Sequence, residues 1–242
     1  MSTGVETLGV ALNRELKETK AHQPAIARDN PGRWNSDRFA AEQIRGLVLQ
    51  VFLSRLRRSC RQVVLTAVDA ATDLGELCCE VGRVLATESG KKVCIVTQQS
   101  CQQGECGLGN ESSKLSFEYR TAEALGGSSR RISNGLWQLP TTALWGESEV
   151  EFAADVLRRR LDQLRTEFDF SVIQAPAAGR DGTAALLGQM TDGVILVLEA
   201  HRTRRLAAQK ALTRLRAADV PLLGLVLSQR TFPIPERLYS CL

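Results

Sequence analysis

The sequence predicts an α/β fold, a three-layer sandwich with a mostly parallel central sheet. Short apolar runs rich in β-branched residues recur along the chain, and such runs suit strands that are buried on both faces. They are residues 62–67, 92–97, 170–174, 193–198 and 222–227. Stretches with helical periodicity separate them, at 74–89, 150–168 and 203–218. Strands that alternate with helices predict βαβ units with right-handed crossovers, and therefore a parallel sheet.

The chain divides into one domain and two terminal segments. Its 242 residues are enough for one sizeable core. Residues 1–36 are polar and contain Pro24 and Pro31, which predicts a flexible N-terminal arm. Apolar residues recur at helical spacing over 37–58, which predicts a helix that opens the domain. We therefore expect a domain over 37–230 and a C-terminal tail over 231–242.

Bulk composition excludes several classes of protein. The formal net charge of +4 is too small to indicate nucleic-acid binding. The N-terminal residues carry charges throughout, and no apolar run approaches the roughly 18 residues of a membrane span. We expect a cytoplasmic protein that reaches the inner face of the membrane, if at all, through a partner.

The cysteines indicate neither a disulfide framework nor a metal site. There are seven of them, an odd number without framework spacing, so we expect reduced thiols. Cys94, Cys101 and Cys106 lack the paired spacing and the nearby histidine that a zinc site needs. Cys78 and Cys79 are expected to be packed in the core. No metal and no cofactor are expected.

Several local motifs, in order, carry a resemblance to a known family. The helix with Glu42 and Arg45 is similar to an ExxRxxR segment, and four further matches are ESGKKVCIV, GLWQLP, FDFSVIQAP and the long stretch that begins TDGVILVLEAHRTRR. In this order, over residues 38–228, they resemble the bacterial tyrosine kinases of capsule and exopolysaccharide export. A more distant resemblance is to the Min/Par ATPases. The resemblance implies a P-loop NTPase-like fold.

The loop after the first strand of the domain lacks the residues that bind phosphate. A P-loop uses glycines to curl backbone N–H groups around phosphates, a lysine for their charge and a hydroxyl for magnesium. By the resemblance, Leu74 stands at the lysine position, and Gly75 and Glu76 stand at the hydroxyl positions. Asp69, Asp73 and Glu76 would make the loop acidic, and their charge would repel phosphate.

Two more positions that the family uses for magnesium are also altered. Where the kinases carry an aspartate pair after the second strand, this chain has Thr97, Gln98 and Gln99. At the Walker-B aspartate position stands Gln174, and a neutral amide is a poor ligand for so hard a cation. Because three separate positions are altered between intact strands, we expect a pseudoenzyme whose nucleotide site is vestigial.

Two surfaces are candidates for contact with a partner. Glu42 and Arg45 match the first two anchors of the segment that lies between subunits in the kinases, whereas the third anchor is Val48, which puts such a ring in doubt. The segment 201–216 is a basic amphipathic helix that includes Arg204 and Arg205. It could form a solvated face or contact an acidic partner or an anionic membrane.

Three functions remain open. The first is a non-catalytic scaffold or regulatory subunit in exopolysaccharide biosynthesis or export, which binds a membrane-bound chain-length (co-polymerase) protein or an active homologue, or forms homo-oligomers. The second is a module that binds a small molecule, or a nucleotide without magnesium. The third is a Min/Par-type positioning protein whose basic helix, with Arg214 beside Arg204 and Arg205, binds membrane or DNA.

Overall fold

The centre of the molecule is an eight-stranded sheet. The computed structural model describes residues 10–12, 36–54, 60–98, 129–145, 154–180 and 182–229. Within them the strand order is β1-β8-β7-β2-β6-β3-β5-β4. The strands are β1 (Val10–Leu12), β2 (Gln62–Ala67), β3 (Val93–Val96), β4 (Arg130–Ser133), β5 (Leu136–Leu139), β6 (Phe170–Gln174), β7 (Gly193–Glu199) and β8 (Leu222–Ser228).

The sheet is parallel except at one edge. Only the hairpin of β4 and β5 is antiparallel among the described strands. β2 lies between β7 and β6, and the chain moves from β2 to β3 on one side and later to β7 on the other. Ligand sites of open parallel sheets lie at such a point, beyond the carboxyl ends of the strands.

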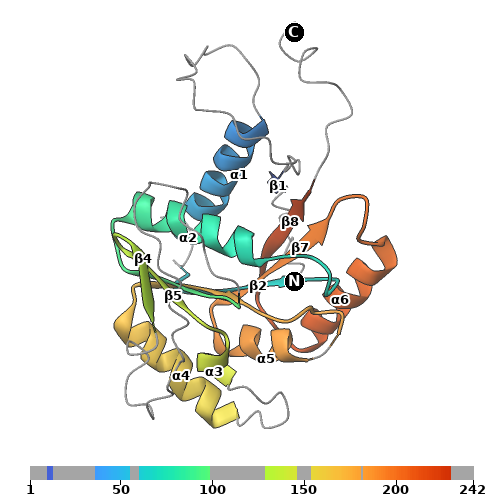
Figure 1. The fold of residues 1–242 in the computed structure, drawn as a ribbon. Coiled ribbons are helices and arrows are strands. Elements are labelled where there is room, and N and C mark those ends of the chain that lie inside the picture. Colours follow the sequence, from blue (N-terminus) through green and yellow to red (C-terminus); the bar gives the residue numbers. More distant parts are fainter. Residues whose placement is uncertain are drawn as a thin grey trace, which may run out of the picture.

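Helices cover both faces of the sheet and make three layers (Figure 1). On one face lie α1 (Ser36–Val51) and α2 (Gly75–Ser89), which contact each other. The other face carries α3 (Thr142–Trp145), α4 (Ala154–Glu167), α5 (Thr183–Met190) and α6 (Arg205–Ala217). The predicted three-layer sandwich with a mostly parallel sheet is confirmed.

Each layer of helices has its own hydrophobic core. Under α1 and α2, the core includes the fully buried Phe52, whose ring meets that of Phe170 edge to face at 6.0 Å between centroids. Under α4, α5 and α6, the core includes Leu161, Leu187 and Leu215. The strands separate the two cores, which is why their sequences are apolar on both faces.

A polar network fixes the amino end of β2. Asp192 accepts hydrogen bonds from the backbone N–H groups of Arg61 (2.7 Å) and Gln62 (2.8 Å). The Arg165 guanidinium donates to the side-chain oxygen of Gln62 at 2.6 Å and lies 3.2 Å from Asp192. Three segments are therefore joined where β2 begins, on the edge of the sheet opposite the strand ends that would carry a site.

The structure differs from the sequence predictions mainly at the edges. The segment expected to be a flexible arm contributes β1, which pairs with β8. The predicted helix at 37–58 ends earlier, at Val51: the N–H of Leu53 bonds to the carbonyl of Val48, five residues back, which breaks the α-helical pattern. Cys78 and Cys79 are buried as predicted, but Cys79 is disulfide-bonded, so the expectation that every thiol is reduced is wrong.

Two helical glycines provide a matched test of packing between α2 and the sheet. A Cβ atom at Gly82 would come within 2.5 Å of the Ile95 side chain, whereas one at Gly46 would meet nothing within 4 Å. Replacing either glycine by alanine adds the same helix propensity, about 1 kcal/mol. We expect Gly82→Ala to be less stable than Gly46→Ala by about 1–3 kcal/mol, the usual cost of overpacking. Urea unfolding measures both, and equal stabilities would show that the contact is not tight.

Candidate functional site

The loop between β2 and α2 closes on itself through its own hydrogen bonds. The N–H of Thr72 donates to the carbonyl of Asp69 at 3.2 Å, and the N–H of Gly75 donates to Oδ1 of Asp73 at 2.9 Å. An aspartate that accepts a backbone N–H at the start of a helix satisfies a donor that a P-loop would offer to phosphate. The carboxylate of Asp73 thus lies where the phosphates of a nucleotide would bind in a P-loop.

Leu74 belongs to the hydrophobic core. Its exposed fraction is 2%, and it is part of the core under α1 and α2 together with Leu77 and Val81. Its carbonyl accepts the N–H of Cys78 at 2.9 Å, within the first turn of α2. A residue that neutralises phosphates must reach solvent or ligand, whereas this side chain is enclosed by apolar atoms. Leu74, at the position where the resembled kinases have a lysine, is therefore a core residue in this fold.

The other two altered positions bond to each other. The hydroxyl of Thr97, which follows β3, donates to the side-chain oxygen of Gln174, the last residue of β6, at 2.5 Å. Thr97 is 1% exposed, and its N–H donates to the carbonyl of Leu139 at 3.0 Å. The structure brings these two predicted site residues together, because β3 and β6 are neighbours. Gln99 lies outside the described residues.

The segment after β6 folds over the carboxyl end of β2. The hydroxyl of Thr66 donates to the Pro176 carbonyl at 2.6 Å, and the N–H of Ala178 donates to the Ala67 carbonyl at 2.8 Å. A Cβ atom on Gly179 would lie 2.5 Å from the Val68 carbonyl oxygen, so a side chain has no room there. This segment holds the beginning of the β2–α2 loop in place.

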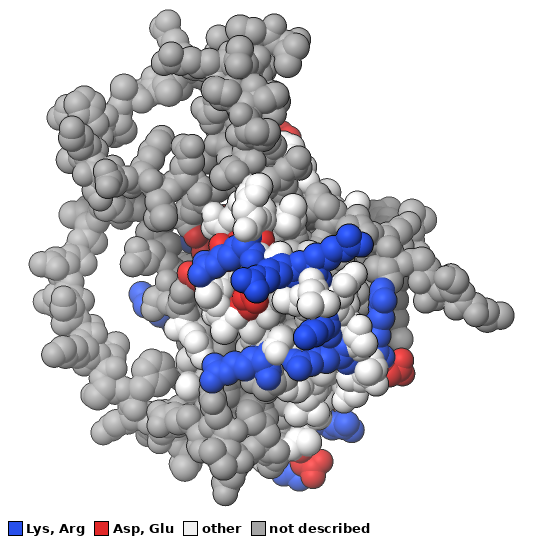
Figure 2. Space-filling view, turned by 90° about the vertical axis from the view of Figure 1, so that its right-hand side faces the viewer, with Lys and Arg blue, Asp and Glu red and all other residues white. Residues whose placement is uncertain are grey.

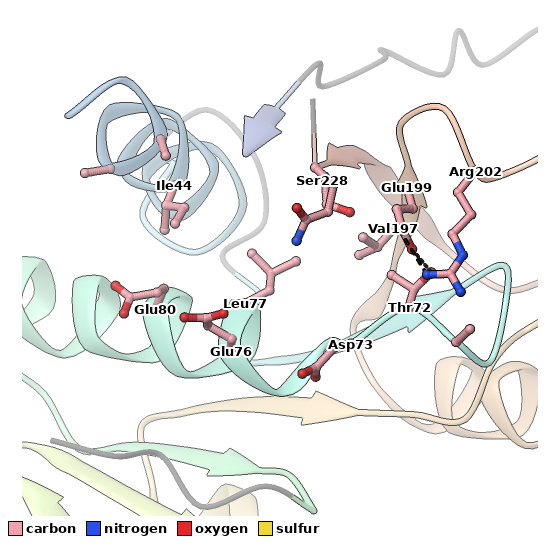
Figure 3. Close-up of a pocket in the computed structure, with 14 residues that line it drawn as sticks. Ile44, Thr72, Asp73, Glu76, Leu77, Glu80, Val197, Glu199, Arg202 and Ser228 are labelled. Carbon is pink, nitrogen blue, oxygen red and sulfur yellow. Dashed lines mark hydrogen bonds and ion pairs between the residues drawn. The ribbon is translucent and has the colours of Figure 1, made fainter. Parts of the chain in front are cut away.

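A cavity of about 400 Å³ lies beside the loop (Figure 3). Ala40, Ala41 and Ile44 of α1 form one wall, and the ends of β7 and β8 form another. The charged side chains in its lining are Asp73, Glu76, Glu80, Glu199 and Arg202. With four carboxylates and one guanidinium, the lining has an excess of negative charge. We expect it to repel a triphosphate, because like charges repel at short range. Of the acidic residues predicted for the vestigial nucleotide site, Asp73 and Glu76 line this cavity and Asp69 does not.

Glu199 connects the loop to the opposite wall of the cavity. Its Oε2 accepts the hydroxyl of Thr72 at 3.1 Å, and its Oε1 lies 3.3 Å from the Arg202 guanidinium (Figure 3). Its backbone N–H donates to the Thr203 hydroxyl at 3.0 Å. Glu199 was not among the residues predicted for the site, although it is the last residue of β7, and sites of parallel sheets lie at the ends of strands.

The thiol of Cys78 is held in its protonated form beneath the loop. Burial, with a smaller contribution from the negative charge of Asp73, raises the pKa of Cys78 from its ordinary 9.0 to about 12. A thiolate is the nucleophilic and metal-binding form of cysteine, so at neutral pH this side chain is a small apolar group.

The predicted partner-contact residues have partners within the chain or project into solvent. Glu42 lies 3.4 Å from Arg38, and Arg45 lies 2.9 Å from Glu88 of α2. Val48, at the third anchor position, is fully buried. Arg204 and Arg205 are exposed at the start of α6. Contact of these residues with another subunit stays a prediction.

The described residues contain neither a cluster of metal ligands nor a helix that could span a membrane. No group of three or more His, Cys, Asp and Glu side chains in the described ranges is placed to hold a metal ion. Within the same part of the chain, none of the helices has the length and apolar character that crossing a membrane requires.

The order of the strands and the helices on both faces of the sheet give the chain a P-loop NTPase-like fold. No family model matches the chain, and no curated protein matches its sequence. Solved structures do match. The chimerical protein CapA2B2 matches with a TM-score of 0.63 and 16% identity over 94% of this chain and 96% of that one.

Two kinase domains of known structure also have a similar fold and low sequence identity to this chain. The kinase domain of the Escherichia coli tyrosine kinase ETK gives a TM-score of 0.56 at 15% identity, covering 96% of this chain and 94% of that one. The VpsO kinase domain gives 0.54 at 16% identity, covering 81% and 98%. MinD of Aquifex aeolicus is less similar, with a TM-score of 0.49 at 15% identity over 69% of this chain and 68% of that one. The chain thus has the fold of bacterial tyrosine kinase domains, which confirms the predicted resemblance at the level of fold.

The burial of Leu74 leads to a test by restoring the lysine. We expect Leu74→Lys to lower the free energy of unfolding by about 3 kcal/mol or more, because an ammonium group would enter the core without a counterion. Leu74→Met, which keeps volume and polarity, should cost less than about 1.5 kcal/mol. Chemical denaturation followed by circular dichroism measures both variants. A lysine variant as stable as the methionine variant would show that position 74 reaches solvent.

Proposed function

We propose that this protein is a non-catalytic scaffold or regulatory subunit of exopolysaccharide biosynthesis or export. The carrying observation is that Leu74, at the position where the resembled kinases hold their phosphate-binding lysine, is a core residue with 2% exposure. A scaffold of this kind needs the kinase fold as a binding frame without the chemistry of the kinase. The pathway comes from the sequence resemblance to kinases of capsule and exopolysaccharide export.

The surroundings of Leu74 support a non-catalytic role. Phosphoryl transfer requires magnesium, and the hydroxyl and amide of Thr97 and Gln174 are engaged with each other at 2.5 Å at the positions where carboxylates would hold it. At the start of α2, Asp73 accepts the N–H of Gly75, so a backbone donor that would stabilise phosphate is occupied. Each change removes a different part of the phosphoryl-transfer machinery.

The partner in this proposal is a membrane-bound chain-length protein or a catalytically active homologue. Both are proteins that the resembled kinases meet in polymer export, and homo-oligomers are a further form of the same assembly. A subunit without turnover would act by occupying a binding surface, and its effect would scale with its concentration relative to the active kinase.

An assay of ATP turnover tests the absence of catalysis. We expect the purified full-length protein with ATP and Mg²⁺ to release no phosphate and to label no tyrosine above the level of a buffer blank, while the ETK kinase domain, assayed in parallel, does both. The matched control is a variant with Asp69, Asp73 and Glu76 changed to Asn, Asn and Gln. Turnover by the protein that changes in this variant, in either direction, would show that the activity belongs to this loop and would contradict the proposal.

The cavity favours a second candidate, a small-molecule binding module. A volume of about 400 Å³ is within the usual range for ligand sites, and the cavity combines apolar walls from Ile44, Leu77 and Val197 with a few polar groups. Its four carboxylates favour a neutral or cationic molecule over a nucleotide. In this reading the altered loop forms one side of a new pocket.

Calorimetry tests whether the ligand of such a module is a nucleotide. We expect titrations of ATP, ADP, GTP and cyclic dinucleotides, each with and without Mg²⁺, to give no heat of binding, because every one of these ligands is anionic. Binding of any of them, weakened when Leu77 is changed to Trp to fill the cavity, would favour the nucleotide module instead. Unchanged binding in the Leu77→Trp variant would place the ligand elsewhere on the protein.

A further inference from the structure

One side of the molecule carries a concentration of positive charge around α6. Figure 2 looks onto this side, where lysine and arginine side chains gather in bands, with uncharged residues between them and acidic side chains beside the upper band. We call this the basic surface. Its residues come from the β7–α6 turn, from α6 and from the segment after β6: Arg180, Arg202, Arg204, Arg205, Lys210, Arg214 and Arg216. Helix α6 itself contains no acidic residue.

Most of these charges are not neutralised within the described part of the chain. Arg202 pairs with Glu199, and the Arg214 guanidinium donates to the Gly179 carbonyl at 2.5 Å. The side chains of Arg204, Arg205 and Lys210 are exposed, and no hydrogen bond or ion pair joins them to another described side chain or backbone group. A group of like charges without counterions raises the local potential and attracts an anionic partner.

An exposed apolar residue lies in the middle of the basic surface. Leu206 is 63% exposed, the most exposed of the large apolar side chains in the described ranges. It follows Arg205, and it stands one helical turn before Lys210 on the same side of α6. An apolar anchor surrounded by arginines is the composition that protein interfaces favour at their centre and rim.

We propose that the basic surface docks an acidic peptide segment of a partner protein, with carboxylates on Arg204, Arg205 and Lys210 and an apolar side chain against Leu206. The proposal rests on the proposed function in one respect, that a scaffold acts through a bound protein. Six of the seven basic residues are arginines, and the planar guanidinium binds a carboxylate through two parallel hydrogen bonds. This geometry favours binding of a partner whose carboxylates lie at a fixed spacing.

The packing of α6 favours a peptide over a lipid bilayer. A helix that lies on a membrane buries an apolar face in the lipid, but the apolar stripe of α6 is turned inward: Ala211 is 0% exposed and Leu215 is 1% exposed. Only Leu206 remains to enter a bilayer. Lipid binding would therefore depend on charge alone, whereas a peptide gains both paired carboxylates and an apolar contact.

Binding to a defined peptide tests the proposal. The probe is a fluorescein-labelled synthetic peptide of glutamates with one central leucine, and its counterpart has every glutamate replaced by glutamine. By fluorescence anisotropy we expect the full-length protein to bind the acidic peptide and not its counterpart. The double variant Arg205→Glu, Lys210→Glu should lose at least about tenfold in affinity. Raising salt from about 50 to about 300 mM should weaken binding, because it shortens the Debye length.

A matched variant separates the basic surface from net charge. Arg158→Glu with Arg159→Glu makes the same change of charge on exposed positions of α4, and it should leave peptide binding unchanged. Equal losses in both double variants would overturn the proposal. It would also be overturned if neither peptide bound, or if vesicles of phosphatidylglycerol and phosphatidylcholine bound through Arg205 and Lys210 while the acidic peptide did not. These outcomes are independent of the ATP assay, which alone decides whether the protein is catalytic.

Discussion

The complete burial of β2 is the constraint on which the rest of the structure depends. All six of its residues are buried, with β7 on one side, β6 on the other and helices over both faces. Each strand that joins this sheet in parallel brings its carboxyl end to the same edge. The loop after β2 therefore lies at the centre of that edge, between the residues that follow β6 and β7. Any chemistry or binding at this edge uses side chains that β2 has positioned.

The same apolar core continues past the strand into the loop, where Leu74 is one of its members. Burial of one leucine side chain stabilises a fold by about 1.5–3 kcal/mol, which a lysine at position 74 would forfeit. The loop is further held by the bond from Gly75 to Asp73 and by the bond from Thr72 to Glu199. These donors are satisfied within the protein, and a nucleotide that used them would have to displace their acceptors beside four carboxylates.

Strands with a strong local pattern could be predicted from the sequence, whereas contacts that depend on the order of strands in the sheet could not. The runs that become β2 and β6 were located to the residue, because a strand buried on both faces must be apolar throughout. β1 and β4 were missed, since a three-residue strand and the polar edge sequence RRIS carry no such pattern. The altered site positions could be named from the resemblance. The bond between Thr97 and Gln174 could not, because it requires that β3 and β6 be neighbours.

Negative and positive side chains form two separate regions at the carboxyl edge of the sheet, and Glu199 and Arg202 lie where the two regions meet. On one side is the acidic cavity, and on the other is the basic surface of α6. These two residues form a 3.3 Å ion pair, and the bond from Thr72 to Glu199 connects the pair to the β2–α2 loop. Since each carboxylate of an anionic segment is attracted by the basic surface and repelled by the cavity, the division directs such a segment along α6 and away from the nucleotide-site position. In the proposed docking mode, the carboxylates of the cavity would therefore add to the selectivity of the neighbouring basic surface.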